Sequence, residues 1–199
     1  MAETAPTDAE IISASLRDPE AFGGIFDRHY DSVFRFVARR LGVSEAGDAA
    51  ADVFDRAFRI RGRYDSSKPE ALPWLYGIAY NIVGDRLRRK ARRERVYLSA
   101  AEADLPDHSD EADLRIVAQQ IGDRLNQALA RIARKDRETI LLYALEGLTY
   151  SEISEVLGIP VGTVGSRISR ARSQILELIP DLEQMISAED PPPNPGDRP

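Results

Sequence analysis

The stretch LTYSEISEVLGIPVGTV, residues 148–164, decides the fold of the second half of the chain. Thr149 or Ser151 can cap a helix here, and Glu152 is spaced to form a capping box with Thr149. Gly158 supplies the left-handed residue that a sharp turn at the end of that helix requires. The stretch therefore predicts a short helix followed at once by a tight turn.

A second helix follows the turn and completes a helix-turn-helix. Ile159 fills the angle between the two helices, and Pro160 begins the second one with its φ angle already set. The apolar positions of this second helix share one face, and the opposite face is small and polar with arginines at its edges. A polar outer face can occur on any helical hairpin, but small polar residues also let a helix enter a major groove, where arginines reach phosphates or guanine. The predicted DNA contacts are Thr163, Ser166, Arg167, Ser169, Arg170 and Arg172.

The rest of the chain also predicts helices, because apolar residues recur at helical spacing and strand signals are almost absent. Helices are expected over about residues 18–37, 48–60 and 73–95, and again from about residue 114. Residues 42–47 interrupt the pattern, and residues 61–73 are rich in turn-forming residues. The expected fold is all-α, with two small helical domains joined by a flexible acidic linker.

Charge is strongly segregated within a chain whose net charge is −6. Residues 32–95 carry 15 basic and 8 acidic residues, net +7, and residues 124–176 carry 8 and 5, net +3. Basic blocks of this kind can neutralise phosphates, whereas the three remaining segments are acidic. The expected organisation is a flexible acidic N-terminus at 1–17, domains at 18–95 and 124–178, an acidic linker at 96–123 and a disordered, proline-rich tail at 179–199.

The first basic block combines a turn-rich loop with a strongly basic helix. Seven of the ten residues from Arg86 to Arg95 are basic, so this helix carries a row of positive charges that can contact successive phosphates. Asn81 can make two hydrogen bonds to a base edge, Tyr80 is the best candidate for stacking on an exposed base, and Trp74 and Tyr76 are further ones. The spacing of Trp74 with Ile78 favours core packing instead. The predicted nucleic-acid contacts are Asp65, Ser66, Ser67, Lys68, Tyr80, Asn81, Arg88 and Arg89.

Several classes of protein are disfavoured by composition. The chain has no cysteine and two histidines, so thiolate metal sites are excluded and histidine-dependent catalysis is poorly supplied. No apolar run is long enough to span a membrane, and the acidic N-terminus lacks a signal core. We therefore expect a soluble cytoplasmic protein that is not an enzyme and has no metal, cofactor, small-molecule substrate or membrane insertion.

Four stretches carry a resemblance to a known family: DAAADVF (48–54), PWLYGIAYN (73–81), GIPVGTVGSR (158–167) and RAR (170–172). In this order they resemble bacterial RNA polymerase sigma factors of the two-domain, extracytoplasmic-function (ECF) type. The resemblance implies a transcription initiation factor that binds core RNA polymerase and directs it to promoter DNA. Its first domain would open the −10 element, with Asn81 and the loop 65–73 receiving a flipped base, and its second would bind the −35 element as duplex.

The resemblance also implies partners and exposes two departures. The polymerase contacts would be Asp48, Asp52, Val53, Phe54 and Arg56, and many relatives are held inactive by an anti-sigma protein. The chain has Gly165 where relatives commonly have Lys or Arg, and Ala51-Asp52 where they often have Gln-Glu. We expect weaker or altered −35 recognition from the first departure.

The alternative function is that of a polymerase-independent helix-turn-helix regulator whose first domain mediates dimerisation. Such a protein would bind a palindromic duplex by itself. The basic helix from Trp74 to Arg95 argues against this alternative, because a dimerisation domain needs no row of positive charges for contacting phosphates.

Overall fold

The computed structural model describes residues 5–97 and 124–180. The chain divides into two compact units, Met1–Glu102 and Ala103–Pro199. Within the described residues every regular element is a helix and none is a strand, which confirms the all-α prediction. The predicted acidic linker from residue 98 onward and the predicted tail from residue 181 lie outside the described residues.

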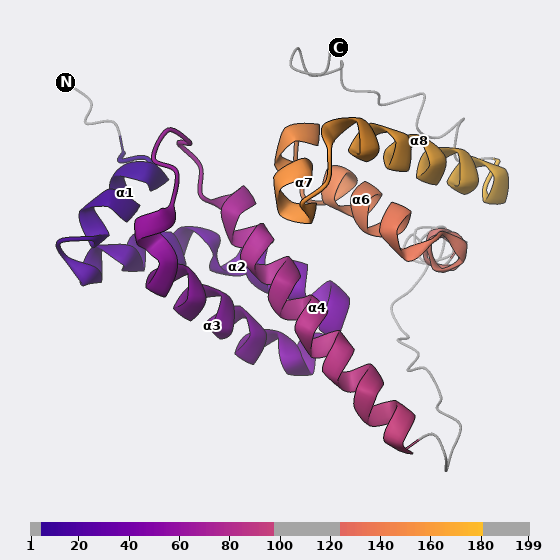
Figure 1. Cartoon of the computed structure of the whole chain (residues 1–199), viewed down its shortest axis with the longest axis horizontal. Coiled ribbons are helices and arrows are strands. Elements are labelled where there is room, and N and C mark those ends of the chain that lie inside the picture. Colours follow the sequence, from indigo (N-terminus) through magenta and orange to yellow (C-terminus); the bar gives the residue numbers. More distant parts are fainter. Residues whose placement is uncertain (1–4, 98–123, 181–199) are drawn as a thin grey trace, which may run out of the picture. The chain divides into compact units, whose positions relative to one another are not determined.

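The first unit is built on three long helices that pack side by side (Figure 1). They are α2 (Gly23–Leu41), α3 (Val43–Ile60) and α4 (Leu72–Tyr97), with short 3₁₀ turns at Pro19–Phe22 and Arg61–Arg63. Their shared core is apolar, and Phe36, Val53 and Leu75 are fully buried in it. Burial of these large side chains supplies the main driving force for packing.

A single glycine separates α2 from α3. Gly42 adopts a φ of 85°, a conformation that is strained for residues with a side chain, and it ends α2 while α3 begins at Val43. We expected the break to extend to Gly47 and the next helix to begin near Asp48. That boundary is wrong because one left-handed residue is enough to reverse the chain, and Gly47 lies inside α3.

Part of the N-terminal segment is helical, contrary to the prediction of a flexible segment over residues 1–17, of which residues 5–17 are described. Residues Asp8–Ser15 form helix α1, and Thr7 and Glu10 make a complete capping box at its start. Ile12 is only 2% exposed. The prediction was based on the acidic composition and overlooked the Thr7-to-Glu10 spacing, which is a helix-start signal.

The second unit is a smaller helical cluster. A helical segment at 124–131 is followed by α6 (Arg134–Ala144), α7 (Tyr150–Leu157) and α8 (Val161–Leu178). Ile132, Ile140, Ala171 and Ile175 form a buried cluster that joins the first segment, α6 and α8. Ile179 is also buried, so the packed unit extends at least one residue into the predicted tail.

Candidate nucleic-acid and polymerase interface

Helices α7 and α8 form the predicted helix-turn-helix. Thr149 caps α7 and makes the capping box with Glu152, while Gly158 ends the helix with a φ of 63°. The hydroxyl of Ser154 donates to the carbonyl of Ile159 at 2.5 Å, which fastens the turn to α7. Pro160 then precedes the first residue of α8. The local sequence therefore fixes the angle at which α8 leaves α7.

Helix α8 has the two faces that its sequence predicts. Val164, Ile168, Ala171 and Ile175 are all buried. The predicted contacts on the other side range from half-buried to exposed: Thr163 and Arg167 are half-buried, and Ser166, Ser169, Arg170 and Arg172 are exposed. The Ser166 hydroxyl donates to the carbonyl of Thr163 at 3.0 Å, so it lies close to its own helix.

Arg170 lies on this surface but is bonded to the protein itself. Its Nε and Nη2 atoms donate to the carboxylate of Asp136 on α6, at 3.3 and 3.2 Å. Asp136 is 3% exposed. The hydrogen bonds from Arg170, and then the charge of Asp136, raise the pKa of the guanidinium above its usual value. Arg170 therefore ties α8 to α6, which the sequence did not indicate.

Gly165, one of the two departures predicted from the family resemblance, faces Tyr150 of α7. A Cβ atom at this position would lie 3.6 Å from Cε2 of Tyr150, an ordinary van der Waals distance. A side chain here would fit, and it would begin beside the Tyr150 ring.

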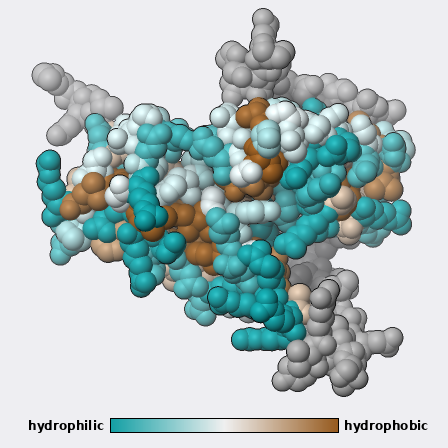
Figure 2. Space-filling view, in the orientation of Figure 1, coloured by the Kyte–Doolittle hydropathy of each residue, from teal (hydrophilic) through white to brown (hydrophobic). Residues whose placement is uncertain are grey.

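The C-terminal half of α4 presents a continuous hydrophilic surface (Figure 2). Arg88, Arg89 and Lys90 are exposed on it. Arg88 is folded back over Gly84 and pairs with Asp85 in the structure. The Asp85 carboxylate partly neutralises Arg88, and only Nη2 of Arg88 is engaged in this ion pair, so its other donors can still reach a phosphate.

The polar and aromatic candidates at the start of α4 differ in accessibility. Asn81 is exposed, and its amide nitrogen donates to the carbonyl of Gly77 at 3.0 Å. Tyr80 is half-buried. Tyr76 is only 3% exposed and stacks on Phe36, so the prediction that it stacks on bases is wrong. Trp74 packs edge-on against Tyr64, with 5.1 Å between the ring centroids.

The loop between α3 and α4 is held by its own hydrogen bonds. The Asp65 carboxylate accepts from the hydroxyl and the backbone N–H of Ser67, at 2.7 and 3.1 Å, and these bonds lower the pKa of Asp65. The Tyr64 hydroxyl donates to the carbonyl of Lys68 at 2.7 Å. Burial, with the nearby charges of Asp8, Asp65 and Glu70, raises the pKa of Tyr64 to about 12.

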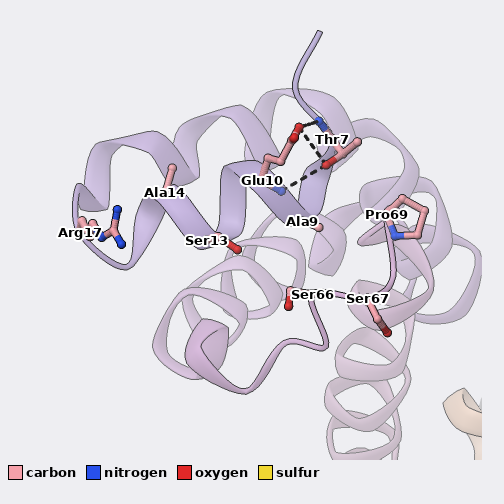
Figure 3. A pocket seen from close by; sticks show the side chains of 9 residues that line it. All are labelled: Thr7, Ala9, Glu10, Ser13, Ala14, Arg17, Ser66, Ser67 and Pro69. Carbon is pink, nitrogen blue, oxygen red and sulfur yellow. Dashed lines mark hydrogen bonds between the residues drawn. The ribbon is translucent and has the colours of Figure 1, made fainter. Parts of the chain in front are cut away.

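An open groove of about 580 Å³ runs between this loop and α1 (Figure 3). Ser66 and Ser67 line one side, and Ser13 of α1 and Arg17, just beyond the end of α1, are among the residues on the other. Glu10 also lines the groove, but its carboxylate is engaged in the capping box. Tyr80 and Asn81 are not among the lining residues, so the structure does not bring the loop and Asn81 together in this groove.

The predicted polymerase contacts on α3 divide into two sets. Asp48, Asp52 and Arg56 are exposed at intervals of four residues and therefore share one face of the helix. Asp52 pairs with Arg86 of α4 at 2.5 Å. Val53 and Phe54 are 0% and 5% exposed, so their prediction as surface contacts is wrong. Both belong to the buried stripe of α3 that holds the bundle together.

Sequence reasoning missed two features of the first unit: an aromatic cluster around Phe54 and the buried carboxylate of Asp8. Phe54 packs against Phe26 and Tyr30, with ring centroids 4.9 and 6.2 Å apart, and Phe26 remains 41% exposed. Asp8 on α1 bonds to residues of α2 and to the end of the loop. The helical spacing of the aromatic residues in α2 could have predicted the aromatic cluster. The partners of Asp8 lie 20 to 63 residues away in the sequence, so no local pattern predicts its hydrogen bonds.

The described part of the chain has neither a cluster of metal-binding side chains nor a membrane-spanning helix. In residues 5–97 and 124–180, no three acidic or histidine side chains cluster so as to hold a metal ion. No helix in these ranges is long and apolar enough to cross a membrane.

Family comparisons match both units. Residues 25–93 match sigma-70 region 2, and residues 122–175 match sigma-70 region 4. The three-helix bundle and the helix-turn-helix therefore define a sigma-70-type transcription initiation factor, which binds RNA polymerase and directs it to promoters.

Relatives narrow the class. The chain is 32% identical over 181 residues to the ECF RNA polymerase sigma factor SigW of Bacillus subtilis, covering 83% of this chain and 92% of SigW. It is 31% identical over 180 residues to the ECF sigma factor SigC of Mycobacterium tuberculosis, covering 88% of this chain and 95% of SigC. The chain belongs to the ECF RNA polymerase sigma factors.

Solved structures show the same fold. The sigma factor RpoE, crystallised with the anti-sigma factor NepR from Bartonella quintana, has a TM-score of 0.61 at 21% identity and covers 80% of this chain and 96% of that one. CnrH, solved with the cytosolic domain of CnrY, has a TM-score of 0.57 at 26% identity and covers 92% of this chain and 99% of CnrH.

Proposed function

We propose that this initiation factor divides promoter recognition between its two units. The loop 65–71 and the exposed face of α4 bind the opened −10 element, and α8 binds the −35 element as duplex. The observation that carries the proposal is the pairing, within one sigma-factor chain, of a helix-turn-helix with an exposed basic helix beside a polar loop.

The proposed −10 surface has the chemistry that trapping of unpaired bases requires. Asn81 keeps its amide oxygen available for a base edge, and half-buried Tyr80 offers a ring for stacking. Ser66 and Ser67 offer hydroxyls on the loop. Lys68, Arg88 and Arg89 supply positive charge for the backbone of the single strand.

The proposed −35 surface relies mainly on Arg167, Arg172 and the small polar side chains of α8. Ser166 and Ser169 leave space for close approach to a major groove, and Arg172 is exposed. Arg170 is engaged with Asp136, so its proposed role is to hold the orientation of α8 and to present its remaining donors to a phosphate.

Core polymerase is proposed to contact the exposed α3 face formed by Asp48, Asp52 and Arg56. Action on polymerase places the protein in the cytoplasm, and the proposed role requires no catalysis by this chain. An anti-sigma protein is a further proposed partner, by analogy with the sigma factor RpoE, which was crystallised with the anti-sigma factor NepR.

Reconstituted transcription tests the proposal. Full-length protein and bacterial core polymerase are mixed with a genomic DNA library, and the RNA start sites are sequenced. Discrete new starts that share two upstream boxes are expected. Asn81→Ala should reduce them, while Asp31→Asn, at an exposed position of α2 outside all the proposed contact surfaces, serves as a surface control. Binding to duplex DNA without new starts would instead support a polymerase-independent regulator, which the family matches do not favour.

A further inference from the structure

Helix α1 is tied to the proposed −10 loop by one buried carboxylate. Asp8 is 7% exposed, and its Oδ2 atom accepts a hydrogen bond from the backbone N–H of Ala71 at 2.9 Å. Ala71 is fully buried and directly precedes α4. This bond therefore fixes the point at which the loop joins the helix that carries Asn81.

Asp8 is itself held by two side chains of α2. Its Oδ2 atom lies 2.6 Å from Nε2 of His29, and its Oδ1 atom accepts from Nη1 of Arg28 at 3.0 Å. Arg28 also donates to the carbonyl of Pro6 at 2.8 Å. Displacing this carboxylate is costly chiefly because the backbone N–H of fully buried Ala71 would be left without an acceptor, whereas Arg28 is exposed to solvent.

The other end of α1 is fastened independently of Asp8. Arg61 donates from Nε to the carbonyl of Ser15 at 3.3 Å, and its guanidinium lies 3.8 Å above the ring of Phe58. Loss of either attachment should loosen α1, but only Asp8 touches the loop at Ala71. The chain thus offers a matched pair of positions for separating the stability of α1 from the placement of the loop.

The near end of the loop is organised by local contacts instead. The side-chain hydrogen bonds of Asp65 and Tyr64 fall within residues 64–68. They shape the turn but do not determine its distance from Asn81. The Asp8–Ala71 bond supplies that restraint at the far end.

We infer that Asp8 is a positioning residue for −10 recognition: it holds the loop 65–71 in register with α4, so that base selectivity depends on α1. The inference rests on the proposed role of the loop. Asp8 touches no DNA in this mechanism and acts through the backbone at Ala71. Neither family match includes residue 8, since the region 2 match begins at residue 25.

The test compares Asp8→Ala, Asp8→Asn and Arg61→Ala in the full-length chain. Trp74 is the only tryptophan and packs on Tyr64 at the start of the loop, so its fluorescence reports binding at this site. The probes are a single-stranded oligonucleotide of the −10 sequence found by start-site sequencing and variants with each of its bases changed in turn. The measured quantity is base selectivity. It is the dissociation constant of the variant strand that binds most weakly, divided by the dissociation constant of the matched strand.

Wild-type protein should prefer the matched strand, and Asp8→Ala should lower that preference by about tenfold. The selectivity of Asp8→Asn should lie between those of the wild type and Asp8→Ala, because the amide oxygen of Asn can still accept a hydrogen bond from the backbone N–H of Ala71. Arg61→Ala should lower the unfolding temperature but keep the wild-type ratio. All measurements are made below the unfolding transition of each variant, and the near-isosteric Asn variant decides the question if the Ala variant does not fold.

Two outcomes would overturn the inference separately from the proposed function. A selective wild type with equally selective Asp8 variants would show that α1 does not position the loop. Equal loss of selectivity in Arg61→Ala would assign the effect to general loosening of α1. If wild-type protein itself shows no selectivity, the proposed role of the loop fails, and the inference fails with it.

Discussion

Asp136 and Arg170 show how a residue on a helix that is proposed to bind DNA can serve the fold. The carboxylate is buried on α6, and Arg170 on α8 donates two hydrogen bonds to it. Removing one partner of such a pair leaves the other without compensation. We therefore expect Asp136→Asn to lower the unfolding temperature of the second unit by about 5 °C.

The same variant should also weaken binding to −35 duplex DNA, although it removes a negative charge. The reason is that α8 loses its tie to α6 and no longer presents its contacts in one orientation. Arg172→Ala should weaken binding with little change in stability, and should reduce the slope of log affinity against log salt by about 1. Stronger duplex binding by Asp136→Asn would mean that Arg170 acts chiefly as a phosphate contact.

Asp8 gives the first unit a distinct response to acid. Burial by itself raises the pKa of this carboxyl, but the hydrogen bond from Ala71, then those from Arg28 and His29 and the charge of His29, bring it below its usual 3.8. A lowered folded pKa contributes stability that is complete above the unfolded pKa of 3.8 and is lost as the pH falls through the folded value.

The unfolding temperature measured by Trp74 fluorescence should therefore drop more steeply below about pH 4 in wild type than in Asp8→Asn. Other carboxyl groups titrate in both proteins, so the difference between them isolates Asp8 and the groups that face it. We expect that difference to shrink as the pH falls from 7 to 3. A difference that stays constant would show that ionised Asp8 contributes nothing to folding.

At the scale of the element, the turn between α7 and α8 depends on one backbone conformation. Gly158 has a φ of 63°, whereas Gly162, four residues later, lies inside α8 with open space where a Cβ would be. Gly158→Ala should destabilise the second unit by about 1 kcal/mol through left-handed strain. Gly162→Ala, in the first turn of α8, should stabilise it by a few tenths of a kcal/mol through helix propensity, less than the roughly 0.8 kcal/mol of a helix interior.

These opposite effects separate backbone strain from the simple addition of a methyl group. Thermal unfolding followed by circular dichroism reports both units, while Trp74 fluorescence reports the first unit alone. The two substitutions should shift the unfolding temperature measured by circular dichroism in opposite directions. Neither should change the unfolding temperature measured by Trp74 fluorescence. Destabilisation by both substitutions would argue that the packing around the turn, and not the φ of Gly158, limits its stability.

The turn also marks where prediction from sequence works. Capping by Thr149, the glycine turn and the buried face of α8 depend on neighbouring residues, and all three were predicted. Asp8 and Asp136 were missed because their partners lie up to 63 and 34 residues away, so no local pattern reveals them. Phe54 was assigned to the polymerase contacts through its family motif, although its helical spacing with Val53 and Ala57 already predicted an apolar, buried face.

For the whole molecule, promoter recognition is the combined effect of two units on one chain. Linked binding modules gain affinity through effective concentration, so a weak module can still contribute when the other is engaged. The family resemblance of the sequence implies that Gly165 omits a cation from α8. The molecule should accordingly depend more on its −10 contacts than on its −35 contacts, which can be measured by scrambling each promoter box in reconstituted transcription.

Gly165→Arg should shift this balance toward the −35 box. The site accepts a side chain, since a Cβ would lie 3.6 Å from the Tyr150 ring, and an arginine there adds one cation to the DNA-binding unit. We expect transcription by the variant to fall more when the −35 box is scrambled, and the salt slope of duplex binding to steepen by about 1. Gly165→Ala is the matched control, because it adds the same helix propensity without charge. If both substitutions act alike, the glycine weakens −35 recognition by destabilising α8 and not by omitting a contact to DNA.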